Sequence, residues 1–129
     1  GYDISIEENG RTGRKPLHWE YLDNADRKGL HDVYAGLMKL RNAHPELFDA
    51  NATLTWKVET SDWDNGRTLL VKSITGKQLV VVGNFTHTAT DIVFPATPGN
   101  WTNYFTGKSE TVNKQVNVPA HGYVVYTNF

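Results

Sequence analysis

Residues 78–85, with the sequence QLVVVGNF, constrain the fold of this chain more than any other stretch. Their centre is an unbroken apolar run, Leu79-Val80-Val81-Val82, with Gly76 before it and the polar sequence THT after it. A short apolar run rich in β-branched residues is typical of a strand that is covered on both faces. We therefore predict a central strand over residues 78–85, with the other strands beside it or across the core from it.

The segments around this run alternate apolar and polar residues, which is the pattern of half-buried strands. It predicts further strands near residues 54–58, 68–74, 92–94, 101–105, 111–118 and 123–127. Within 111–118, Val112, Val116 and Val118 are expected on one face of a single strand. About seven short strands with frequent turns predict a mainly β chain that forms an antiparallel Greek-key β-sandwich. The expected core residues are Leu79, Val81, Val118 and Val125.

One amphipathic helix is predicted before the strands, over residues 26–44. Asp26 suits the N-cap position, and His44-Pro45 ends the helix because a residue before proline avoids the helical region. The apolar side chains of this helix cover an arc of about 160° of its surface, whereas a helix with one neighbour needs an apolar stripe of about 100°. They are Leu30, Val33, Tyr34, Leu37, Met38 and Leu40. The helix is therefore expected to have two neighbours. When one of them is missing, we expect weak self-association, or part of the loop over residues 1–19 covering that face.

These patterns divide the chain into a loop over residues 1–25, the helix over 26–44, a linker over 45–52 and an all-β domain over 53–129. The chain begins GYDIS without Met, so we expect it to be a piece of a longer protein.

Composition excludes several classes of function. Lys plus Arg is 13 and Asp plus Glu is 14, a formal charge of −1, which gives no support to nucleic-acid binding. No apolar run approaches the length of a membrane span, and the absence of Cys removes disulfides and thiolate metal sites. The five histidines, His18, His31, His44, His87 and His121, show no metal-ligand spacing, and no phosphate-binding loop follows a strand. We therefore expect no metal and no cofactor in this chain.

Candidates for chemistry are few. Glu7-Glu8 is an adjacent acidic pair in a loop, where such charges are usually solvated. Asp62 and Asp64 hint at a calcium loop but lack its spacing and its terminal Glu. Trp63 lies at the tip of a predicted turn, where it would serve as a sugar platform or fold back over the sandwich; folding back is favoured. No catalytic residue is therefore assigned.

The order of motifs resembles the carboxy-terminal part of α-amylase-family glycoside hydrolases. Residues 14–19, RKPLHW, resemble the segment after the last barrel strand of that family, and residues 37–47, LMKLRNAHPEL, resemble the end of its last barrel helix. Residues 79–84, 101–105 and 118–126 resemble three strands of its all-β carboxy-terminal domain. The resemblance covers nearly the whole chain through the order and spacing of these motifs.

The resemblance implies a non-catalytic carboxy-terminal fragment of an enzyme that hydrolyses α-glucans such as starch and maltooligosaccharides. The family's catalytic acids lie on earlier barrel strands and have no counterpart here. The all-β domain would stabilise the catalytic barrel, its expected partner, and assist glucan binding. Tyr2, Asp3 and Trp19 would border a subsite at the active-site face of the barrel, and Trp63 is a further candidate for substrate binding. For a starch-degrading parent, an extracellular or periplasmic location is expected.

Two other functions remain open. The chain could be a carbohydrate-binding module, which would display exposed coplanar aromatic side chains and bind glucan measurably. It could also be a structural or adhesion β-sandwich, although the Cys–Trp–Cys pattern of immunoglobulin domains is missing and a preceding helix is not expected there.

Overall fold

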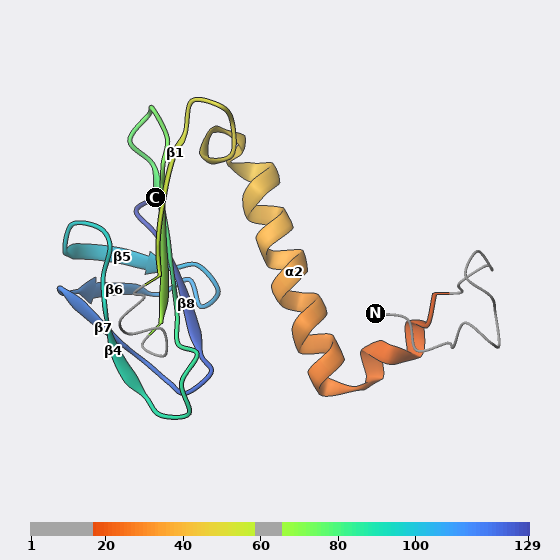
Figure 1. Ribbon diagram of the computed structural model, residues 1–129. Coiled ribbons are helices and arrows are strands. Elements are labelled where there is room, and N and C mark those ends of the chain that lie inside the picture. The colour runs from red at the N-terminus through yellow and green to blue at the C-terminus, as the bar shows by residue number, and fades with distance from the viewer. Residues whose placement is uncertain (1–16, 59–65) are drawn as a thin grey trace. The chain divides into compact units, whose positions relative to one another are not determined.

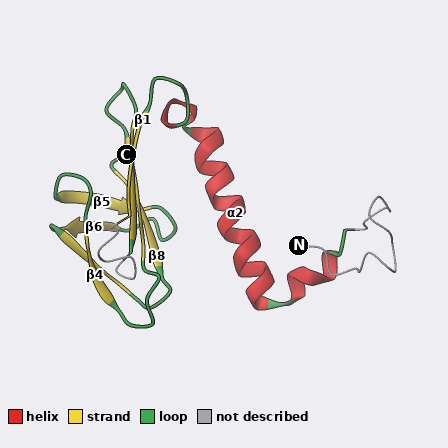
Figure 2. Ribbon diagram, viewed as in Figure 1, coloured by secondary structure: helices red, strands yellow, loops and turns green. Residues whose placement is uncertain are grey.

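The computed structural model describes residues 17–58 and 66–129, and it shows helical elements followed by antiparallel β-sheets (Figures 1 and 2). The chain forms two compact units, and the second unit begins at Lys39. The prediction of a mainly β chain with one preceding helix is confirmed. The segment from Leu17 contains a short 3-10 helix, η1 (Trp19–Asp23), where a loop was predicted.

The long helix, α2, spans Ala25–Ala43. Its N-cap is Asn24, not Asp26 as predicted, because the Asn24 side-chain oxygen accepts hydrogen bonds from the backbone N–H groups of Asp26 and Arg27, each at 3.1 Å. The helix ends before His44-Pro45 as expected. Leu40, near its carboxyl end, is its buried residue, whereas Leu30, Tyr34 and Met38 are exposed.

Six strands form the larger sheet, in the order β1-β2-β3-β8-β5-β6 (Figure 1). Their bounds are β1 Thr53–Val58, β2 Arg67–Lys72, β3 Gln78–Gly83, β5 Gly99–Asn103, β6 Ser109–Val112 and β8 Tyr123–Thr127. Two strands, β4 (Thr90–Val93) and β7 (Gln115–Val118), form the smaller sheet. Strand β8 returns beside β5, as the last strand of a Greek key lies beside the first. Strand β3 is central, hydrogen-bonded to β2 and β8, which confirms its predicted position.

Both faces of β3 are covered, because successive side chains of a strand point to opposite sides of a sheet. Val80 and Val82 are fully buried in a core shared with the smaller sheet. Leu79 and the partly buried Val81 lie on the opposite face, in a second cluster that contains Leu40 and Leu47. The expectation of a single core was therefore wrong. Three of its four residues are buried, but Val118 belongs to the first cluster and Leu79 and Val125 to the second.

The prediction of one strand over residues 111–118 was also wrong. The strand structure is interrupted at Asn113-Lys114, and β6 joins the larger sheet whereas β7 joins the smaller one. Val112 and Val118 nevertheless reach the same core. The two sheets face each other across that core, so both valines are buried although they come from different sheets.

The segment predicted as a linker carries a core residue. Its short 3-10 helix, η2 (Pro45–Leu47), places Leu47 among the most buried side chains of the described residues. Arg41 lies over the ring of Phe48, with 5.5 Å from its guanidinium carbon to the ring centroid. The end of the helix and the 3-10 turn are therefore part of the β unit.

Replacing Leu79 by Ala should lower the free energy of unfolding by about 2–5 kcal/mol, because the substitution leaves a cavity at a position that is 4% exposed. Leu54→Ala is the matched control, since Leu54 lies on the same sheet face but is 61% exposed, and it should change stability by no more than about 0.5 kcal/mol. Urea denaturation followed by circular dichroism measures both. Equal losses for the two variants would contradict the assignment of this core.

Candidate functional site

The outer face of the larger sheet, defined as the face that points away from the smaller sheet, is the most distinctive surface of the β unit. Register places Leu54 beside Val71 and Trp56 beside Leu69. Further along the sheet, the same face continues through β3 and β8 with the residues Leu79, Val81, Tyr123 and Val125. Arg67 and Thr127 also lie on this face, which is otherwise apolar across four neighbouring strands.

Only part of this outer face is buried within the β unit. Leu40 and Leu47 cluster with Val71, Leu79 and Val125 and cover the centre of the face. At the β1 edge, Leu54 is 61% and Trp56 is 68% exposed. An aromatic side chain and a leucine on an edge strand, both open to solvent, mark a surface suited to a partner.

A second group of aromatic residues lies at the β8 side of the outer face. Tyr123 contacts Phe105 with ring centroids 5.9 Å apart, and Phe105 contacts Tyr104 at 5.4 Å. The interplanar angles are 82° and 74°, so the rings meet edge to face. Such rings do not form the coplanar platform on which pyranose rings stack.

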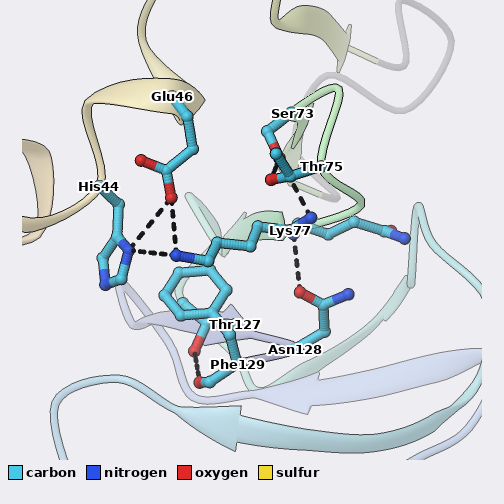
Figure 3. A network of polar contacts seen from close by, with 9 residues as sticks. His44, Glu46, Ser73, Thr75, Lys77, Thr127, Asn128 and Phe129 are labelled. Carbon is cyan, nitrogen blue, oxygen red and sulfur yellow. Dashed lines mark hydrogen bonds and ion pairs between the residues drawn. The ribbon is translucent and has the colours of Figure 1, made fainter.

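A polar clamp of His44, Glu46, Lys77 and Phe129 fixes the end of the helix to the sheet (Figure 3). The Lys77 ammonium donates to Glu46 Oε1 at 2.7 Å and to His44 Nδ1 at 3.1 Å. The same ammonium lies 5.2 Å from the centroid of the Phe129 ring, which also packs against His44. The hydrogen bond from Lys77 is the main reason why the pKa of Glu46 falls from 4.5 to about 2.

The hairpin that presents Lys77 is tied to the end of the chain. Asn128 accepts a hydrogen bond from the Gln78 N–H at 2.7 Å (Figure 3). It also donates to the Gly76 carbonyl at 3.1 Å. Ser73 Oγ accepts from the Lys77 N–H at 3.1 Å and closes the turn. These contacts hold Lys77 where it meets Glu46, so the clamp is a structural device.

Each carboxylate among the described residues of the β unit has a structural partner. Glu46 pairs with Lys77, Asp49 accepts from the backbone N–H groups of Asn51 and Ala52, and Asp91 accepts from Asn117. Glu110 accepts from the Tyr126 hydroxyl at 2.7 Å. Burial, with a smaller effect of Glu110, raises the pKa of Tyr126 above its usual value. These four carboxylates are thus committed to the fold.

A cleft of about 600 Å³ lies between the two sheets. Its polar lining includes Thr55, Lys57 and Thr68 from the larger sheet and Asp91 and Gln115 from the smaller one. Among the described residues, Asp91 is the one carboxylate in this lining, whereas glycoside hydrolysis requires a pair facing across the scissile bond. The described walls of the cleft therefore lack the groups for that reaction.

The residues predicted to bind substrate are not brought together in the described part of the chain. Tyr2, Asp3 and Trp63 lie outside the described residues. Trp19 begins η1 and is 71% exposed. The alternating pattern placed Trp56 on one face of a half-buried strand, and it did not show that this side chain would be exposed. The exposure follows from the position of β1 at the end of the sheet order.

Comparison of the chain with models of protein families finds no match, and no curated protein matches it either. Over residues 17–58 and 66–129, no helix is long and apolar enough to cross a membrane. The same residues contain no cluster of three or more His, Cys, Asp or Glu side chains positioned for a metal ion.

The clamp gives a pH dependence with a defined sign. A carboxylate whose pKa is lowered in the folded protein contributes stability above its ordinary pKa of 4.5, and this contribution is lost as the pH falls toward about 2. The stability difference between the native chain and Glu46→Gln should therefore be full at pH 6 and shrink progressively below about pH 4.5.

The stability difference between the native chain and Lys77→Met should show the same pH dependence. The variant with both substitutions should be no less stable than the less stable of the two single variants. Denaturant unfolding at a series of pH values measures these differences. A difference between the native chain and Glu46→Gln that does not change with pH would rule out the ion pair as its cause.

Proposed function

We propose that this chain is the non-catalytic carboxy-terminal part of an α-amylase-like hydrolase of α-glucans. In this proposal the β unit is an accessory domain whose outer sheet face docks on the catalytic barrel and stabilises it. The observation that carries the docking role is the exposure of Trp56 and Leu54 on a sheet face that is mostly apolar and partly buried. The identity of the partner rests on the order of sequence motifs that resemble that family.

Two properties of the described residues support a non-catalytic role. The carboxylates of the β unit are each held by a structural partner, so none is presented as a free acid or base. The cleft between the sheets offers one carboxylate where the reaction needs two. Catalysis would then belong to the barrel, and the β unit would contribute stability and assist in holding glucan.

A carbohydrate-binding module is the second candidate, and the aromatic side chains of the outer face are the observation that favours it. The measured pairs, however, meet edge to face at 74° and 82°. A sugar ring stacks on a flat and accessible aromatic face, whereas a protein partner accepts aromatic anchors in any orientation that fills a pocket. Protein docking therefore accounts better for this surface. An adhesion sandwich stays as a third possibility.

The chain alone should release no reducing sugar from soluble starch or maltooligosaccharides. It should also migrate unretarded in native gels that contain starch, or be retarded only slightly. Release of reducing sugar that disappears on mutation of Glu7 or Glu8 would contradict the non-catalytic role. Strong retardation that Trp56→Ala abolishes would instead support a carbohydrate-binding module.

Docking is tested by calorimetric titration of the chain with the catalytic barrel of an α-amylase-family hydrolase from which the all-β domain has been removed. Trp56→Lys should weaken binding by about 2 kcal/mol or more, about thirtyfold, because a buried tryptophan anchor is replaced by a charge. Val93→Lys is the matched control, since Val93 is 60% exposed but lies on the smaller sheet. Equal weakening by both variants would contradict docking through the outer face.

A further inference from the structure

Two exposed histidines that are far apart in the sequence meet at one end of the β unit. His87 lies between β3 and β4, and His121 lies in the turn between β7 and β8. His121 Nε2 and His87 Nδ1 are 3.1 Å apart, and the ring centroids are 4.8 Å apart at an interplanar angle of 81°. The pair has no part in the proposed docking face or in the clamp.

The backbone around the two histidines is held in place by a buried side chain. The amide nitrogen of Asn84 donates to the carbonyl of Thr88, one residue beyond His87, and to the carbonyls of Val118 and Pro119, just before His121. A direct backbone bond from His121 N–H to the Thr86 carbonyl, at 3.2 Å, joins the two loops. One buried amide therefore fixes both loops that carry the imidazoles.

The conformation of His121 is also specific. Its φ of 53° lies in the left-handed region, which is uncommon for residues other than glycine, although Asn, Asp and His adopt it more often than the rest. The following Gly122 has no room for a side chain, because an added Cβ would come within 2.9 Å of the Pro119 carbonyl oxygen. The tight turn thus directs the His121 ring toward His87.

We propose that His87 and His121 form a two-histidine chelate for a divalent transition-metal ion, with water completing the coordination. Imidazole nitrogens bind such ions at about 2.0–2.1 Å, which separates two nitrogens by about 2.9 Å at a right angle and about 3.3 Å at a tetrahedral angle. The observed 3.1 Å lies between these values. The ion would lie to one side of the line that joins the two nitrogens, so both exposed rings would have to rotate to turn their lone pairs toward it.

The proton balance of this site is simple. In the metal-free pair, one of the two facing nitrogens carries the hydrogen that the other accepts. Metal binding requires both facing nitrogens to be unprotonated, so that hydrogen moves to the outer nitrogen of the same ring, by exchange with water. The ion then bridges the two facing nitrogens in place of the hydrogen bond, and each ring keeps one N–H. No oxidation or bond cleavage is involved.

The donor set predicts which ions bind. Two neutral imidazoles with water favour Cu²⁺ over Ni²⁺ and Ni²⁺ over Co²⁺, and they do not select Mg²⁺ or Ca²⁺, which prefer oxygen ligands. Calorimetric titration of the full chain with each metal chloride should show this order, with one ion bound per chain. Electron paramagnetic resonance of the Cu²⁺ complex should show coupling to two imidazole nitrogens.

Single-site variants test the pairing. His87→Ala and His121→Asn should each weaken Cu²⁺ and Ni²⁺ binding by about tenfold or more, because the second donor no longer acts at high effective concentration. Asparagine is chosen at position 121 because it tolerates the left-handed conformation. His31→Ala, which removes another exposed histidine, is the control and should bind both ions with unchanged affinity.

A readout in the native chain does not depend on the folding of any variant. Substoichiometric Ni²⁺ should broaden the imidazole C–H resonances of His87 and His121 in the NMR spectrum before those of His18, His31 and His44. The proposal is overturned if the five histidines broaden together, if His31→Ala weakens binding as much as His87→Ala, or if the Cu²⁺ complex contains a single imidazole nitrogen.

Discussion

The structure depends on the burial of β3 from two sides at once. Val80 and Val82 belong to the core between the sheets, and Leu79 belongs to the cluster that Leu40 and Leu47 complete. A strand can be apolar at consecutive positions only when both of its faces are removed from water. The short segment at the helix end is therefore as necessary to the β unit as its strands, because it covers the second face.

This requirement explains why the helix end and the 3-10 turn belong to the β unit. Leu40 and Leu47 supply the apolar cover, and the ion pair of Glu46 with Lys77 orients it. The cover is also limited in extent. It leaves Leu54 and Trp56 open at the β1 edge, and this remainder of the face is what we propose to be a docking surface.

Polar groups in this chain serve the fold more than chemistry. Asn84 is buried and its amide nitrogen contacts three backbone carbonyls. Asp91 and Glu110 accept hydrogen bonds that join two strands, and Asp49 accepts within its own turn. A buried polar group must be paired, and Asn84 meets this requirement. The proposed metal pair differs, because His87 and His121 are exposed and contact each other.

The sequence by itself determined the strand periodicity, the central position of β3 and the end of the helix at His44-Pro45, because these follow from local patterns of burial and backbone restriction. It did not reveal the break between β6 and β7, since valines from two facing sheets point into the same core and mimic one alternating strand. Nor did it predict the exposure of Trp56 or the meeting of His87 with His121 across 34 residues. Those features depend on which strands become edges and which loops lie side by side, and only the tertiary structure decides this.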